Sequence, residues 1–128
     1  MLAKANRIVR ADDYRNTVRR GRKSATAHCV VYARRRPENV EPLGPESRFG
    51  FIVAKNVGNA VARNTVRRRL KAIAYERLTR PDHDFLPERT DVVIRALPGS
   101  IEVPWSTLLE EITGVIDRGA QNLQGVKA

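Results

Sequence analysis

Disulfides, membrane segments and secretion signals are missing from this sequence. Cys29 is the only cysteine in 128 residues, which excludes an internal disulfide and is typical of proteins from a reducing compartment. No apolar run approaches the roughly 20 residues that a membrane-spanning helix needs. Residues 1–7, MLAKANR, lack the apolar centre of a secretory signal. We therefore expect a cytoplasmic protein with no membrane partner.

Residues that commonly carry catalysis or bind metals are few and scattered. The two histidines, His28 and His83, show no zinc-type spacing with Cys29. The adjacent Asp12 and Asp13 suit the first turn of a helix better than a two-metal pair, which needs further carboxylates converging from elsewhere. No glycine-rich phosphate loop is present. We therefore expect no catalytic residue in the protein and leave metal binding open, with any phosphodiester chemistry coming from a partner.

Acidic residues are scarce in the first two thirds of the chain. The net charge is +10, from 24 Lys and Arg against 14 Asp and Glu. Residues 1–80 hold 20 of the basic and 6 of the acidic residues, whereas residues 81–128 hold 4 and 8. This asymmetry predicts one basic surface directed at an acidic partner, not a uniformly cationic protein.

A strongly cationic helix is predicted after residue 59 and lasts to about Leu78. Val66, Leu70 and Ile73 fall within roughly 60° of one another on a helical wheel and can face a core. An adjacent arc of about 140° holds four cations and one amide, which we call the cationic row: Arg63, Asn64, Arg67, Arg68 and Lys71. Like charges at i,i+4 spacing cost a few tenths of a kcal/mol per pair. Phosphates would reverse the sign of that cost.

A solvated surface and a membrane-surface helix are the alternatives to nucleic-acid binding for the cationic row. Most charge runs are simply solvated, but the density of Arg beside an ordered apolar stripe favours phosphate recognition. A membrane-surface helix would need a wide aromatic or Leu-rich face, which this helix lacks. The pattern therefore favours nucleic acid as the partner.

The rest of the pattern predicts a compact α/β sandwich with the order α-β-β-α-β-α. A short helix has Asp12 or Asp13 as its cap or first-turn acid and is closed by Gly21, and a longer one runs from about Pro104 to Gly119. Valine-rich and aromatic segments predict three strands, at residues 26–35, 48–55 and 91–97.

The segments between these elements predict a single domain over residues 1–128. Residues 37–47 are rich in proline and acids and are typical of an exposed loop or flexible tongue. Residues 80–88 form a connection, and the tail at 119–128 is expected to fray. The ordered core is expected at about 6–118.

Strand alternation assigns aromatic residues to definite faces. Val30 and Tyr32 share one face of their strand, and Phe49 and Phe51 share one face of theirs. Gly50, between the two phenylalanines, permits the close approach of another backbone or of a flat ligand.

On the first helix, Tyr14 and Val18 lie on one side at i,i+4 spacing. We expect Val18 in the core. Tyr14 has four arginines near it in the sequence, so it either joins the core or stacks on a base.

Residues 49–71, FGFIVAKNVGNAVARNTVRRRLK, resemble the signature of the bacterial ribonuclease P protein subunit. The core Gly-x-Ala-Val-x-Arg-Asn-x-x-Arg-Arg spans residues 58–68 and is far more specific than a generic basic helix. Residues 7–22 are similar to the opening segment of the family, and the strand at Asp91 and the helix at Trp105 follow in the expected order. The resemblance covers about residues 6–118.

The resemblance implies an α+β fold in which a four-stranded sheet packs with three helices, like a small ribosomal-protein domain with a left-handed βαβ crossover. A fourth strand is then required, either near the start of the cationic helix or from splitting residues 24–35. The implied activity is removal of the 5′ leader from precursor transfer RNA. The catalysis belongs to the RNA subunit with Mg²⁺, in a complex of one RNA and one protein monomer.

The resemblance also implies two binding surfaces. One faces the catalytic RNA and comprises the cationic row with Arg69: Arg63, Asn64, Arg67, Arg68, Arg69 and Lys71. The other borders the single-stranded leader: Tyr14, Val18, Tyr32, Phe51 and Lys55. Gly58 and Ala60 form the structural turn between them. The chain departs from the family at Tyr14, where phenylalanine is common, and at Asn56 and Thr65, where basic residues are usual.

Two further functions are compatible with a basic domain. The first is a ribosomal-type RNA-binding or RNA-chaperone protein with no linked reaction. The second is a protein-only nuclease, which would have to use Asp12, Asp13 or His28. The signature at residues 60–68 favours the ribonuclease P subunit over both.

Overall fold

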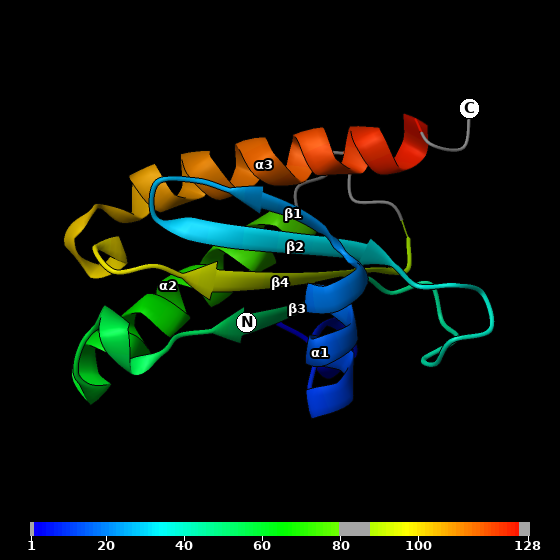
Figure 1. Ribbon diagram of the computed structural model, residues 1–128, viewed down its shortest axis with the longest axis horizontal. Helices are drawn as coiled ribbons and strands as arrows, with labels where there is room; N and C mark the ends of the chain where they lie inside the picture. Colours follow the sequence, from blue (N-terminus) through cyan, green and yellow to red (C-terminus); the bar gives the residue numbers. More distant parts are fainter. Residues whose placement is uncertain (1, 80–87, 126–128) are drawn as a thin grey trace.

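Three α-helices, four strands and three short 3-10 helices make up the computed structural model, which describes the backbone of residues 2–79 and 88–125 and side chains up to residue 118 (Figure 1). The α-helices are α1 (Ala11–Arg20), α2 (Ala60–Thr79) and α3 (Trp105–Gly125). The strands are β1 (Arg22–Ala25), β2 (Cys29–Arg35), β3 (Arg48–Ile52) and β4 (Thr90–Ala96). The 3-10 helices are η1 (Lys4–Asn6), η2 (Lys55–Val57) and η3 (Ser100–Glu102).

The strands form one mixed sheet in the order β1-β2-β4-β3. β2 is antiparallel to β1 and β4, whereas β3 and β4 are parallel. Parallel neighbours need a crossover connection, which α2 supplies. With both strands pointing up, β4 lies to the right of β3 and α2 passes behind the sheet (Figure 1), which makes the crossover left-handed. The expected fold is confirmed, including this exception to the usual handedness.

β1 is the strand that the sequence pattern missed. Its four residues, Arg-Lys-Ser-Ala, are polar or small and lie at the edge of the sheet, so they carry no apolar alternation. Of the two places expected for a fourth strand, the start of the cationic helix is wrong and the segment near residue 24 is right. The strand follows α1 directly through Gly21, where a Cβ would lie 2.4 Å from the carbonyl oxygen of Thr17.

The sheet separates two apolar clusters. On one face, α2 and α3 cover the larger cluster, which includes Cys29 and Val31 of β2. On the other face, α1 covers a smaller cluster that includes Val30 and Tyr32. The predicted alternation of β2 is therefore confirmed, and the molecule has three layers (Figure 1).

The apolar stripe predicted for the cationic helix is confirmed in α2. Val66, Leu70 and Ile73 are each 0% exposed and belong to the larger cluster. Truncating such a buried Leu or Ile to Ala typically costs about 2–5 kcal/mol of stability. This burial fixes the orientation of the helix, so the cationic row beside the stripe must face outward.

The turn before α2 depends on Gly58 and Asn59. The backbone N–H of Ala62 donates to Asn59 Oδ1 at 2.9 Å, which caps the first turn of the helix. A Cβ on Gly58 would lie 2.8 Å from the Cβ of Ala62. The structural turn expected at Gly58 and Ala60 is therefore present, and Ala60 is the first residue of α2.

The ends of α1 and α3 agree with the sequence at three of four positions. α1 has Asp12 and Asp13 in its first turn and ends before Gly21. α3 begins at Trp105, directly after the predicted Pro104, but continues to Gly125. The expected end at residue 119 is therefore wrong, because glycine lowers helix stability without forbidding the helical backbone.

A buried group of charges, which we call the Asp91 cluster, joins three elements at the end of the sheet. Asp91 is 2% exposed and accepts hydrogen bonds from Arg36 Nη1 at 2.6 Å and from Arg48 Nη2 at 2.7 Å. Arg48 also reaches Asp13 of α1, at 3.3 Å. Two buried guanidinium groups therefore share the carboxylate of Asp91, and one of them also reaches a partly exposed carboxylate on α1.

The loop at residues 37–47 is tied down by two arginines. Arg36 donates to the carbonyl oxygens of Pro42, Gly44 and Glu46. Arg89 donates to carbonyl oxygens along the same loop. The loop lies outside the regular elements, as expected, and its flexibility stays a prediction.

Several expectations fall on residues that the structure does not describe. The connection expected at 80–88 lies almost entirely there, as do His83 and residues 126–128 of the expected frayed tail. Within the described residues, no helix is long and apolar enough to cross a membrane.

Candidate nucleic-acid interface

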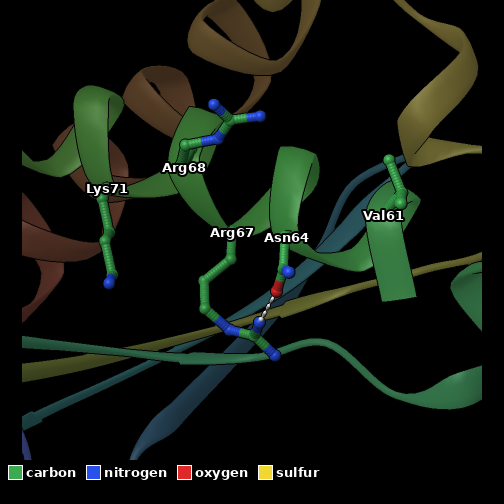
Figure 2. A pocket seen from close by; sticks show the side chains of 5 residues that line it. All are labelled: Val61, Asn64, Arg67, Arg68 and Lys71. Atoms are coloured by element: carbon green, nitrogen blue, oxygen red, sulfur yellow. Dashed lines mark hydrogen bonds between the residues drawn. The ribbon is translucent and has the colours of Figure 1, made fainter. Parts of the chain in front are cut away.

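The cationic row lies on the outward side of α2, and four of its members share a hollow. Asn64, Arg67, Arg68 and Lys71 line it together with Val61, which is 74% exposed (Figure 2). The hollow is open to solvent and encloses about 480 Å³. These residues are brought together because i,i+3 and i,i+4 neighbours share one face of a helix.

Two cations of the row, Arg67 and Arg68, have neutral partners inside the chain. Arg67 Nη1 donates to Asn64 Oδ1 at 3.0 Å (Figure 2), and Arg68 Nη2 donates to Thr65 Oγ1 at 3.4 Å. Among the described residues, no carboxylate lies within ion-pair distance of the row. An amide and a hydroxyl orient the guanidinium groups without cancelling their charge, so the row remains available to an external anion.

Arg69 points away from the row. Its Nη1 donates to the carbonyl oxygens of Ile101 and Val103, each at 3.3 Å. These bonds tie α2 to the segment before α3. The structure therefore gives Arg69 an internal role and does not bring it together with the other residues expected to bind the catalytic RNA.

On the opposite face of the sheet, α1 packs Tyr14 and Val18 against the smaller cluster, which includes Tyr32. The ring of Tyr14 lies over Gly50, where a Cβ would be 2.5 Å from ring atom Cε1. The Tyr14 hydroxyl also accepts a hydrogen bond from the backbone N–H of Phe51 at 3.2 Å. The flat group that Gly50 admits is therefore Tyr14 of the same chain, and the side chain stays partly exposed.

The expected leader-binding residues do not all share this face. Phe51 packs against the larger cluster, under α2 and α3, so the sheet separates its side chain from Tyr32. Lys55 is exposed in η2, beyond the end of β3. Tyr14, Val18 and Tyr32 thus form the group that we call the α1-face cluster, and the expected place of Phe51 in it is wrong.

Two cations beside the α1-face cluster were missed by sequence reasoning. The guanidinium carbon of Arg95 lies 5.7 Å from the centroid of the Tyr32 ring, within cation–π distance. Lys23 is the direct register partner of Tyr32 across β1 and β2, so it shares that face. The face of Arg95 could have been predicted, because it alternates with Val92 and Ile94 along its strand. The face of Lys23 could not, because Lys23 lies on the strand that the pattern missed.

The residues that a protein-only nuclease would use each pair with a different residue of the chain. Asp12 pairs with Arg15, and Asp13 pairs with Arg48. His28 Nδ1 lies 2.6 Å from Glu111 Oε2. No group of three potential metal ligands occurs within the part of the chain that the structure describes.

The surroundings of Cys29 and Glu111 shift the pKa values of both side chains. Burial raises the pKa of Cys29 to about 12, so its thiol is not a nucleophile at neutral pH. Burial alone would raise the pKa of Glu111, but hydrogen bonds from the His28 ring, Thr26 and the His28 backbone hold that pKa below its ordinary value.

The architecture and the site define a class: a small α+β protein that presents uncompensated cations on one helix and a mixed aromatic and basic surface on the far side of its sheet. The profile of the family described as Ribonuclease P matches residues 2–119. The ribonuclease P protein component of Clavibacter michiganensis subsp. michiganensis is 44% identical over 123 residues, which cover 96% of this chain and 100% of that protein. The chain belongs to the ribonuclease P protein family.

Solved structures agree with the fold. The ribonuclease P protein of Staphylococcus aureus superimposes with a TM-score of 0.71 at 22% identity, covering 88% of this chain and 93% of that one. The protein from Thermotoga maritima gives a TM-score of 0.69 at 21% identity, covering 88% and 96%. Members of this family are the protein component of an RNA-processing ribonuclease.

Proposed function

We propose that this chain binds the catalytic RNA of ribonuclease P and the 5′ leader of precursor transfer RNA, and thereby assists removal of the leader. The observation that carries the proposal is the cationic row, which lies within the family signature and has no carboxylate partner among the described residues. Family membership by itself implies an RNA partner in a ribonucleoprotein.

The row suits an RNA backbone because of its spacing and its charge. Arg63 and Arg67 are one helical turn apart, as are Arg67 and Lys71. Each guanidinium can donate two parallel hydrogen bonds to phosphate oxygens. Each phosphate that is neutralised releases counterions, so assembly is strongly favoured at low salt. The repulsion among the cations is relieved at the same time.

The α1-face cluster suits a single strand of varied sequence. Tyr14 offers partly exposed aromatic surface, and Arg95 and Lys23 supply cations on the same face, whereas Tyr32 is buried at 4% exposed. Stacking and phosphate contacts tolerate any base, because every base has a π-face. A protein that serves many different precursors needs this tolerance. The opposite positions of the two surfaces would let one protein contact both RNAs at once.

The chemistry is assigned to the RNA partner. The family resemblance implies Mg²⁺, but the described residues present no cluster of three carboxylate, histidine or cysteine ligands that fits the ion. We therefore assign the ion to the RNA phosphates. The role of the protein is to neutralise phosphates and to position the leader. A cytoplasmic location and a complex of one RNA with one protein complete the proposal.

A reconstitution assay tests the proposal. The full chain is added to a bacterial ribonuclease P RNA in low Mg²⁺ with a precursor that carries a leader, and release of the leader is measured. We expect cleavage to increase, and Arg68→Ala to reduce assembly more than Arg69→Ala does. No increase in cleavage, with RNA binding intact, would favour a ribosomal-type RNA-binding protein instead.

Tyr14→Ala tests the second surface separately. We expect it to reduce the preference for precursor over mature transfer RNA while leaving affinity for the catalytic RNA unchanged. The size of the expected loss is that of one stacked base, about 1–3 kcal/mol. If Tyr14→Ala and Arg68→Ala gave the same uniform loss, the division into two surfaces would be wrong.

A further inference from the structure

A second pocket adjoins the cationic row, and its lining includes apolar and aromatic side chains that phosphate contacts do not explain. It lies between α2 and the N-terminal segment, encloses about 550 Å³ and is open on one side. We call it the N-terminal pocket; its lining residues are Leu2, Arg7, Arg68, Lys71, Ala72 and Tyr75. Arg68 and Lys71 also line the hollow of the cationic row, so the two sites are continuous.

The wall opposite α2 is held in place by the sheet. The backbone N–H of Ile8 donates to the carbonyl oxygen of Phe49 at 2.9 Å, and Arg7 forms a parallel bridge with Phe49. Asn6 Nδ2 donates to the carbonyl oxygen of Ser47 at 2.8 Å. Leu2 is only 8% exposed and belongs to the larger cluster. The wall opposite α2 is therefore anchored to the sheet and to the core.

Its chemistry combines an exposed aromatic ring with three cations. Tyr75 is 45% exposed and lies on the same face of α2 as Lys71, which is one turn nearer the start of the helix. Arg7, Arg68 and Lys71 surround it, and none of the lining residues is acidic. A protein partner would have to supply carboxylates to match these three cations. A single nucleotide matches the whole pocket, because it carries a flat base for the ring and an anionic phosphate for the cations.

We propose that the N-terminal pocket holds one unstacked nucleotide of the catalytic RNA, with its base against Tyr75 and its phosphate among Arg7, Arg68 and Lys71. This inference rests on the proposed function, because it extends the same RNA strand from the cationic row into the pocket. It assigns Tyr75 and Arg7 to RNA recognition, although both lie outside the family signature at residues 49–71. Tyr75 supplies stacking, and Arg7 supplies charge.

The test compares stacking and charge variants in complexes of the full chain with ribonuclease P RNA, without precursor. Tyr75→Ala should weaken affinity by about five- to hundredfold and leave the salt dependence unchanged, because stacking releases no counterions. Tyr75→Phe keeps the ring and should stay near wild type. Arg7→Ala should lower the slope of log affinity against log salt by about one. Chemical probing should show one base that becomes reactive in Tyr75→Ala.

Leu43→Ala is the matched control, because Leu43 is 61% exposed and lies outside the pocket. It should leave affinity and probing unchanged. Thermal unfolding of every variant verifies that the fold is intact, and Arg7→Ala tests the pocket independently if Tyr75→Ala unfolds.

Three results would overturn the inference. They are full affinity in Tyr75→Ala, an equal loss in Tyr75→Phe, or an unchanged salt slope in Arg7→Ala. If Arg68→Ala still weakens assembly in those cases, the proposed function stands and only the pocket assignment fails. If Arg68→Ala also has no effect, the proposed function fails with it.

Discussion

Arginines occur in two contrasting settings in this protein. In the Asp91 cluster, Arg36 and Arg48 are 2% and 7% exposed and share a buried carboxylate. In the cationic row, the partners that Arg67 and Arg68 find among the described residues are an amide and a hydroxyl. In the Asp91 cluster the chain supplies the counter-charge, and where the row faces outward, the counter-charge is left to a partner.

This difference predicts where each charge has its effect. A buried ion pair that loses one member leaves an uncompensated charge in a low dielectric. Truncating a solvent-exposed cation costs the protein little stability, because solvent already screens the charge. Substitutions in the first setting should therefore alter folding, and substitutions in the second should alter RNA affinity.

The largest effect is expected for Asp91→Ala. Removing the carboxylate leaves Arg36 and Arg48 buried without their shared partner, which should cost about 3–5 kcal/mol of unfolding free energy. Urea denaturation measures the change. The control is Asp12→Ala, because Asp12 pairs with Arg15 at the surface and should contribute less than about 1 kcal/mol. Equal losses in the two variants would remove the distinction between the settings.

Asn64→Asp would give the cationic row the internal carboxylate that it lacks. Asn64 Oδ1 already accepts from Arg67 and lies one turn before Arg68, so the new charge should stabilise the helix by about 0.3–0.5 kcal/mol. RNA affinity should fall roughly tenfold, because one cation is neutralised before binding. Filter binding over a salt series and thermal unfolding measure the two effects. A variant that bound RNA as well as wild type would contradict the assignment of the row.

Arg69→Ala tests the contrast within a single helix. The guanidinium donates to two carbonyl oxygens in the segment before α3, so its loss should cost about 1 kcal/mol of stability. The salt dependence of RNA binding should not change, unlike that of Arg68→Ala. A lower salt slope in Arg69→Ala would show instead that Arg69 contacts phosphate, as the family resemblance implied.

The smallest effect is expected for the pH dependence of the Glu111 contact with His28. The pKa of Glu111 is below its ordinary value in the folded state, so the contact stabilises the fold above the unfolded pKa of about 4.3. That contribution should be lost as the pH falls through the folded pKa.

Glu111→Gln provides the comparison for this contact. The difference in unfolding free energy between wild type and variant should be less than about 1 kcal/mol at pH 6 and should shrink below pH 4.3. Urea denaturation at both pH values measures it. A difference that grew at acid pH would contradict the sign.

Local periodicity was sufficient to predict the elements that bury one of their faces. The stripe of Val66, Leu70 and Ile73 and the alternation of β2 could both be predicted, because burial of one side imposes the period. The cationic row could be predicted for the same reason, since its members occupy the arc beside the stripe.

Relations between elements were not accessible from the sequence. Alternation within β3 placed Phe49 and Phe51 on one face but could not decide whether Tyr32 lies on that face or on the opposite one. The shared carboxylate of Arg36 and Arg48 lies at residue 91, beyond the reach of local spacing. β1 has too few residues and too little apolar character to produce a signal.

The burial of Cys29 has a practical consequence. This sole thiol is 0% exposed, and its pKa is raised to about 12, so maleimide reagents should not label the folded protein at neutral pH. A cysteine introduced at the surface, such as Ala72→Cys beside Tyr75, would then be the single reactive position. Fluorophores or cross-linkers could be attached there without altering the native core, and any labelling of the unmodified chain would report unfolding.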